Sequence, residues 1–175
     1  TYKDAVELAY SGAQIIHPKT IKPLENKNII LYVRPFSSPT EAGSVIKSST
    51  SSPIHTPVLI LRSNQVLVSL LPHDFSFVLE ESLQKAFSLM NKHRLKISAI
   101  QSSAVSISVC VDNTRYLPAA LDELSNDFKV KYNENLELLT IRGKTDDVIE
   151  KYTKGRKILL LQSTRTIARI LMRVK

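Results

Sequence analysis

Residues 95–111, which read LKISAIQSSAVSISVCV, decide the predicted fold. Apolar and polar side chains alternate through residues 95–101 and again through residues 105–111, a pattern that is typical of strands with one buried face. Only Ser102, Ser103 and Ala104 separate the two runs. So short a separation predicts that the two strands pair as an antiparallel hairpin.

The segments on either side of this hairpin complete a unit. Residues 66–71 (VLVSLL) predict a strand, and residues 76–92 predict a helix that carries an apolar stripe at helical spacing. After the hairpin, Pro118 opens a second helix that ends near Asn126, and residues 128–132 form a last strand. The order is βαββαβ, which predicts an α+β fold of the ferredoxin-like kind.

The same order then begins again. Residues 136–142 predict a strand, residues 146–153 a short helix, and residues 157–162 and 167–174 two more strands, so the second copy lacks its last helix and strand. The turn of the first hairpin reads Ile-Gln-Ser-Ser at 100–103, and that of the second reads Leu-Gln-Ser-Thr at 161–164. This likeness predicts an internal repeat of about 65–70 residues.

The first third of the chain has a different character. It predicts two short helices before Lys27 and a strand at residues 28–34, followed by a stretch at 37–57 that is rich in Ser, Thr and Pro. Because this stretch lacks the apolar content of a core, we expect a linker there. The predicted organisation is a first domain at 1–46, a linker at 47–62, a first module at 63–133 and an incomplete second module at 134–175.

Composition excludes several classes of protein. The 175 residues contain 24 Lys and Arg against 16 Asp and Glu, which gives a net charge of +8. The chain has no run of about 18 apolar residues, so no transmembrane helix or membrane partner is expected. The single Cys110 excludes an internal disulfide and fits a reducing cytoplasm. The four His residues and Cys110 never fall at metal-ligand spacing, and no glycine-rich loop could hold a phosphate.

A resemblance to a known family narrows the interpretation. Residues 8–21, with Gly12-Ala13 and His17-Pro18, resemble the motif that closes the kinase domain of aspartokinases. Residues 74–77 (DFSF) and 101–111 (QSSAVSISVCV) resemble the first ACT module of the same family. The resemblance implies the end of an α/β kinase domain followed by tandem ACT modules. It also implies that the catalytic, ATP and Mg²⁺ sites lie upstream, so no catalytic residue, cofactor or phosphoryl transfer is expected in this segment.

Aspartokinases phosphorylate the β-carboxylate of aspartate with ATP, and their ACT modules bind an end-product amino acid and mediate dimerisation. The resemblance therefore implies a homodimer and an effector such as lysine or threonine. The expected contacts lie where the first strand meets the first helix, against the turn between the second and third strands of an ACT partner. A helix N-terminus there could receive the effector's carboxylate. Carried over, the effector-binding residues are Pro72, His73, Asp74, Phe75, Ser76, Ser98, Gln101, Ser102 and Ser103.

Two other functions compete with effector binding. The enterobacterial lysine-sensitive pattern has carboxylates where this chain has Ser98 and Ala104, which motivates an ACT pair that only dimerises the enzyme. The net charge of +8 motivates a sheet that binds nucleic acid. However, such a sheet needs exposed aromatic side chains on its central strands, and the strand VSISVCV has none. We therefore expect no nucleic-acid partner.

Overall fold

A computed structural model describes residues 1–49, 56–73 and 80–174. The chain divides into two compact units, Thr1–Ile60 and Leu61–Lys175. Each is described by itself.

The first unit contains two helices and a small hairpin. Helix α1 (Tyr2–Ser11) begins at a capping box, in which the Thr1 hydroxyl accepts from the Asp4 amide, and ends at Gly12, whose φ of 116° is in the left-handed region. Helix α2 (Pro18–Asn26) has Pro in its first turn, as predicted. Strands β1 (Leu31–Val33) and β2 (Ser44–Ile46) pair antiparallel, so the predicted strand is present but shorter.

The core of this first unit is small. Among its described residues, only two apolar side chains are buried, those of Tyr2 and Ile21. The Tyr2 hydroxyl donates to the carbonyl oxygen of Ile29 at 2.6 Å, which joins α1 to the segment before β1. The Phe36 side chain is fully exposed. So little burial is typical of a segment that completes its core against further protein.

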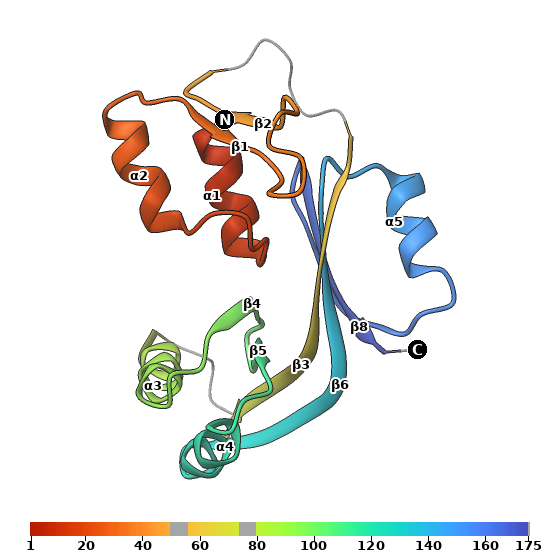
Figure 1. Cartoon of the computed structure of the whole chain (residues 1–175). Coiled ribbons are helices and arrows are strands. Elements are labelled where there is room, and N and C mark those ends of the chain that lie inside the picture. The colour runs from red at the N-terminus through yellow and green to blue at the C-terminus, as the bar shows by residue number, and fades with distance from the viewer. Residues whose placement is uncertain (50–55, 74–79, 175) are drawn as a thin grey trace. The chain divides into compact units, whose positions relative to one another are not determined.

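The second unit is built on one curled sheet whose strand order is β4-β5-β3-β6-β8-β7 (Figure 1). The pairs β3–β5, β4–β5, β6–β8 and β7–β8 are antiparallel. The α+β class and the succession of strands and helices agree with the prediction. The elements are β3 (Val58–Pro72), α3 (Glu80–Lys92), β4 (Ile97–Ser102), β5 (Ile107–Asp112), α4 (Leu117–Ser125), β6 (Phe128–Arg142), α5 (Asp146–Thr153), β7 (Ile158–Ser163) and β8 (Ile167–Arg173).

Two strands of 15 residues each differ from the prediction. Strand β3 begins at Val58, so the last five residues of the predicted linker at 47–62 lie in a strand. The cause is their sequence, VLILR, whose β-branched and apolar side chains favour extended backbone over a solvated linker. Strand β6 joins the last predicted strand of the first module to the first strand of the second, and the two long strands lie side by side (Figure 1).

Three apolar clusters hold the second unit together. The first lies between α3, α4 and one face of β3, β4 and β5, and includes Val66, Val68, Leu70, Met90, Ile107 and Leu124. The second joins the opposite face of those strands to the second module, through Leu67, Ala99, Cys110, Leu136, Leu138, Leu160 and Leu171. In the third, Val148 and Ile149 of α5 pack on Leu139, Ile141, Ala168, Ile170 and Met172. The two modules therefore pack face to face, with helices on the outer sides.

The internal repeat is visible in the strand register. Strand β4 has an irregularity between Ile97 and Ala99, and strand β7 has one between Ile158 and Leu160, 61 residues further along. The predicted Gln pair also matches, because Gln101 pairs with Ser108 and Gln162 with Arg169, again 61 residues apart. The two hairpins are thus copies of each other in register as well as in sequence.

Candidate functional site

Four of the predicted effector-binding residues lie at one end of strands β3, β4 and β5. Pro72 ends β3, and His73 follows it. The turn between β4 and β5 lies at the same edge, because Ile107 pairs with both Leu70 of β3 and Ser102 of β4. Pro72 and His73 therefore lie at the same end of the strands as Ser102 and Ser103, with β5 between β3 and β4. Gln101 precedes Ser102 on β4. Asp74, Phe75 and Ser76 lie outside the described residues.

A hollow of about 410 Å³ opens beside the end of β3. Its charged and polar side chains come mostly from α3 and from the start of β6. The Lys85 ammonium pairs with the Asp127 carboxylate across it, and His73 Nε2 lies 3.1 Å from the Ser125 carbonyl oxygen. Seven residues line it: Pro72, His73, Glu81, Ser82, Lys85, Asp127 and Phe128.

Five of these lining residues were not predicted, and one of them, Phe128, is the first residue of β6. Glu81, Ser82 and Lys85 come from the first turns of α3, while Asp127 precedes β6. The signal that could have found the helical members is the spacing of Glu81 and Lys85, which places them on one helical face. Asp127 lines the hollow because the chain folds back after α4. Local sequence patterns do not reveal such a long-range arrangement.

The Ser103 hydroxyl stabilises the hairpin turn. Its Oγ accepts from the amides of Val105 (3.3 Å) and Ser106 (3.1 Å), and it lies 2.9 Å from the Ser106 Oγ. In the second hairpin, Thr164 Oγ1 accepts from the Ile167 amide at 3.1 Å. The hydroxyl at this position therefore shapes the turn in both copies.

The structure does not bring Ser98 to this edge. Ser98 is buried at the opposite end of β4, where its Oγ accepts a hydrogen bond of 2.7 Å from Arg62 Nη1. Arg62 Nη2 also donates to both carboxylate oxygens of Asp112, at 2.6 and 2.7 Å. Gln65, which is buried, adds a bond of 2.7 Å to the same carboxylate. Ser98 thus belongs to a polar cluster around Arg62. Its small hydroxyl fits beside the Arg62 guanidinium and accepts one of its hydrogen bonds.

Cys110 and Glu123 have shifted pKa values. Burial raises the pKa of the Cys110 thiol to about 12, which keeps it neutral. Hydrogen bonds from Lys92 and then His93 lower the pKa of Glu123, which is half-buried. Neither group lines the hollow beside β3. Among the described residues, no cluster of His, Cys, Asp and Glu could hold a metal ion.

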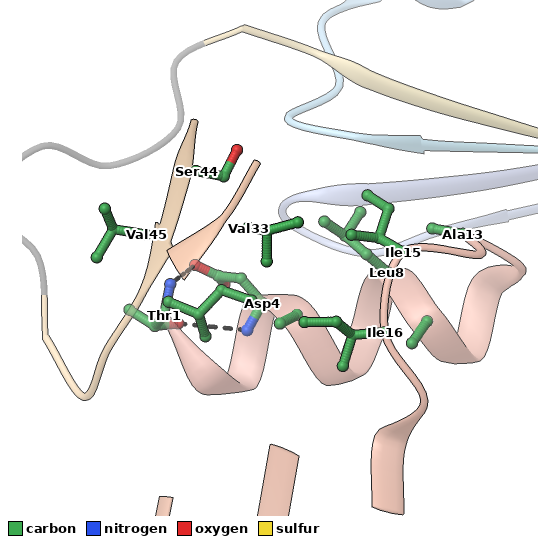
Figure 2. A pocket seen from close by; sticks show the side chains of 12 residues that line it. Thr1, Asp4, Leu8, Ala13, Ile15, Ile16, Val33, Ser44 and Val45 are labelled. Atoms are coloured by element: carbon green, nitrogen blue, oxygen red, sulfur yellow. Dashed lines mark hydrogen bonds and ion pairs between the residues drawn. The ribbon is translucent and has the colours of Figure 1, made fainter. Parts of the chain in front are cut away.

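A second cavity lies within the first unit and is mainly apolar (Figure 2). Its volume is about 160 Å³, and Leu8, Ile16 and Val33 are among the side chains around it. The ion pair between the N-terminal ammonium and Asp4 lies at one end, as Figure 2 shows. His17, on the connection between the helices, caps α2, because its Nδ1 accepts from the Lys19 amide at 3.2 Å.

The sequence and the fold are similar to those of known proteins. No protein-family profile matches the chain. The chain is 27% identical over 151 residues to the lysine-sensitive aspartokinase 3 of Escherichia coli, a match that covers 81% of this chain and 33% of that protein. It is 29% identical over 145 residues to the chloroplastic aspartokinase 3 of Arabidopsis thaliana, covering 81% and 25%. Its homologues are aspartokinases. The chain spans a third or less of the length of these two aspartokinases.

Solved aspartokinase structures have the same fold. E. coli aspartokinase III in complex with lysine and aspartate matches 97% of this chain and 41% of its own, with a TM-score of 0.78 and 23% identity. The regulatory subunit of aspartate kinase from Thermus thermophilus matches 69% of this chain and 89% of its own, with a TM-score of 0.51 and 13% identity. The resemblance to aspartokinases predicted from the sequence is confirmed. The structure has no helix, among its described residues, that is long and apolar enough to cross a membrane.

Proposed function

We propose that this chain is the C-terminal regulatory region of an aspartokinase, in which ACT modules bind an end-product amino acid and inhibit the kinase. The observation that carries the proposal is the match to the T. thermophilus regulatory subunit, which covers 89% of that subunit. The enzyme as a whole would transfer the γ-phosphate of ATP to the β-carboxylate of aspartate. Within that enzyme, this chain would bind the end-product amino acid.

The first unit would be the end of the kinase domain. Its small core supports this assignment, because a unit with two buried apolar side chains needs further protein to pack against. The described residues offer no group of acidic side chains that fits Mg²⁺. The resemblance to aspartokinases implies that ATP and Mg²⁺ bind upstream in the enzyme, and we assign no phosphoryl-transfer step to the described residues.

The effector site would lie at the end of the sheet where β3 ends and where the turn between β4 and β5 is located. A free amino acid needs donors for its carboxylate and acceptors for its ammonium group, and it is recognised best where both converge. His73, Gln101 and Ser102 offer side chains of both kinds on the described part of this edge. Ser98 leaves the proposed set, because its hydroxyl is bonded to Arg62.

The proposal includes a homodimer in the cytoplasm. Strand β4 is an edge of the six-stranded sheet, and Ile100 on it is exposed. Exposed apolar side chains on such a strand can pack against those of a second copy about a two-fold axis. The lone Cys110 thiol fits a reducing compartment.

Thermal unfolding of this chain with lysine, threonine or methionine tests effector binding. An amino acid at about 100 times its Kd stabilises the folded state by about 2.7 kcal/mol. For a chain of this size, that raises the Tm by roughly 5–10 °C. The D-enantiomer should give no shift, and His73→Ala or Gln101→Ala should reduce the shift of the L-amino acid.

If no amino acid shifts the Tm of the folded chain, effector binding by this region is refuted. A pair of modules that only dimerises the enzyme would then be favoured. Sedimentation of the same sample identifies that case, because such a pair would still form a dimer.

A further inference from the structure

Gln162 links the two hairpins of the second unit. It lies in β7, and its side-chain Nε2 donates a hydrogen bond to the main-chain oxygen of Ile100 in β4. The two residues are 62 positions apart, and β4 and β7 are the two outer strands in the order of the sheet. Strand pairing therefore does not account for this contact.

The Ile100 carbonyl points to the open edge of β4. In an antiparallel pair, every second residue directs its amide and carbonyl away from its partner strand. The Ser103 amide donates to the Ser106 oxygen at 2.8 Å, and the register continues as Ser102 with Ile107, Gln101 with Ser108 and Ile100 with Val109. Ile100 is thus in a pair without mutual hydrogen bonds, and the Gln162 amide supplies the donor that β5 does not.

The bond lies at the margin of the apolar contact between the modules. Ala99, next to Ile100, and Leu160, two residues before Gln162, are each 4% exposed and belong to the same cluster. The Gln162 side chain is half-buried. The bond itself is exposed, so it competes with water and its net contribution is that of one ordinary hydrogen bond.

The repeat provides an internal comparison. Gln101 occupies the equivalent position in the first hairpin, yet its side chain is exposed, and no hydrogen bond joins it to another described residue. Gln101 and Gln162 thus occupy equivalent register positions but differ in the hydrogen bond that Gln162 makes to Ile100. Only Gln162 reaches across to the other module.

We infer that Gln162 is a positioning residue that holds the β4–β5 hairpin in its binding geometry and so couples the second module to the effector site. The inference rests on the proposed function for its regulatory meaning. The hairpin carries Gln101, Ser102 and Ser103, and Gln162 holds the residue immediately before them. A change in the second module would move that hairpin through this bond.

Amide hydrogen exchange of this chain tests the positioning without a ligand. Gln162→Glu keeps the size of the side chain, but a carboxylate cannot donate to the Ile100 oxygen. We expect the Gln101 and Ser103 amides to exchange about 3- to 10-fold faster in this variant, the range expected for the loss of one hydrogen bond. Amides of β3 should not change. Ser163→Ala, on the neighbouring residue of β7, and Gln101→Ala should leave the Ser103 amide at the wild-type rate.

Calorimetric titration with L-lysine or L-threonine tests the coupling. We expect Gln162→Glu to weaken the Kd by about 3- to 10-fold, whereas Ser163→Ala leaves it unchanged. If the wild type binds and Gln162→Glu binds equally well, the inference is overturned while the proposed function stands. If the wild type binds neither amino acid, the proposed function fails, and equal exchange rates in wild type and variant would overturn the positioning role independently.

Discussion

Asn64 and Asn135 occupy equivalent places in two long strands and share one backbone conformation. Their φ angles are 55° and 57°, in the left-handed region, and each lies inside a strand of 15 residues. The Asn64 oxygen accepts from the Asn113 amide at 2.9 Å, and the Asn135 oxygen accepts from the Val174 amide at 3.1 Å. In both strands, the buried run begins just after the Asn. Asn tolerates this conformation better than other residues that have a Cβ.

Replacement of Asn135 tests this backbone requirement. We expect Asn135→Ala to lower the free energy of unfolding by about 1–2 kcal/mol, because Ala is strained at positive φ. Asn135→Gly should lose less, because Gly has no Cβ. Urea titration of both variants gives the comparison, and an Ala variant at least as stable as the Gly variant would contradict the assigned conformation.

Removal of the Asp112 carboxylate should destabilise the second unit. Asp112→Ala removes the carboxylate that accepts from the Arg62 guanidinium and the Gln65 amide, which keep, among the described residues, only Ser98 and Ser63 as acceptors. We expect a loss of about 1.5–3 kcal/mol, the range for hydrogen bonds to charged groups. Asp127→Ala is the matched control, because it breaks the more exposed pair with Lys85 and should cost about 0–1 kcal/mol. Equal losses in the two variants would argue against the partly buried cluster around Arg62.

The hairpin turn should distinguish Ala from Thr at position 103. Ser103→Ala removes the hydroxyl that accepts from Val105 and Ser106, so we expect a loss of about 0.5–1.5 kcal/mol. Ser103→Thr should be tolerated, because Thr164 makes the same kind of turn in the second hairpin. Chemical denaturation of the two variants checks this order. A Thr variant as unstable as the Ala variant would mean that the two turns are not equivalent.

Cys110 should be protected from alkylation at neutral pH. Its buried thiol has a pKa raised from 9.0 to about 12, so the reactive thiolate is scarce in the folded chain. This shift contributes stability below pH 9, and that stability is lost progressively as the pH rises from 9 towards 12. Iodoacetamide labelling across a urea titration should therefore follow unfolding. Rapid labelling of the fully folded chain would refute burial.

The Glu123 carboxylate should make a pH-dependent contribution. Its pKa is lowered from 4.5 by Lys92 and His93, so its stabilisation is present above pH 4.5 and disappears as the pH falls through the lowered value. The difference in urea midpoint between wild type and Glu123→Gln should be larger at pH 6 than at pH 3. A difference that is the same at both pH values would contradict the assignment.

The regular part of the fold could be predicted because each of its elements has a local signal. The alternation in the two hairpins and the repeated Gln-Ser turn gave the strands and their copies. The long strands β3 and β6 could not be predicted in full, because their continuity depends on neighbours that are distant in the chain. The start of β3 at Val58 is one example, since the Ser- and Pro-rich stretch before it suggested a linker.

The candidate site was predicted in part for a similar reason. Pro72, His73, Ser102 and Ser103 lie at one edge because strand order alone brings them there. The contact between Ser98 and Arg62 was not predicted, because the two residues are 36 positions apart in the sequence. Asp127 escaped prediction because it reaches the hollow only after the chain has returned through α4. Pairwise contacts between distant side chains leave no periodic signal.

The 15-residue strand β6 belongs to both modules, and this limits how the chain can be divided. A cut at the predicted module boundary, between residues 133 and 134, would fall within that strand. Each product would lose one side of the apolar contact made by Leu67, Ala99, Leu138 and Leu171. Neither module is therefore an independent building block, so gene fusions, domain swaps and truncations should treat residues 58–174 as one indivisible part.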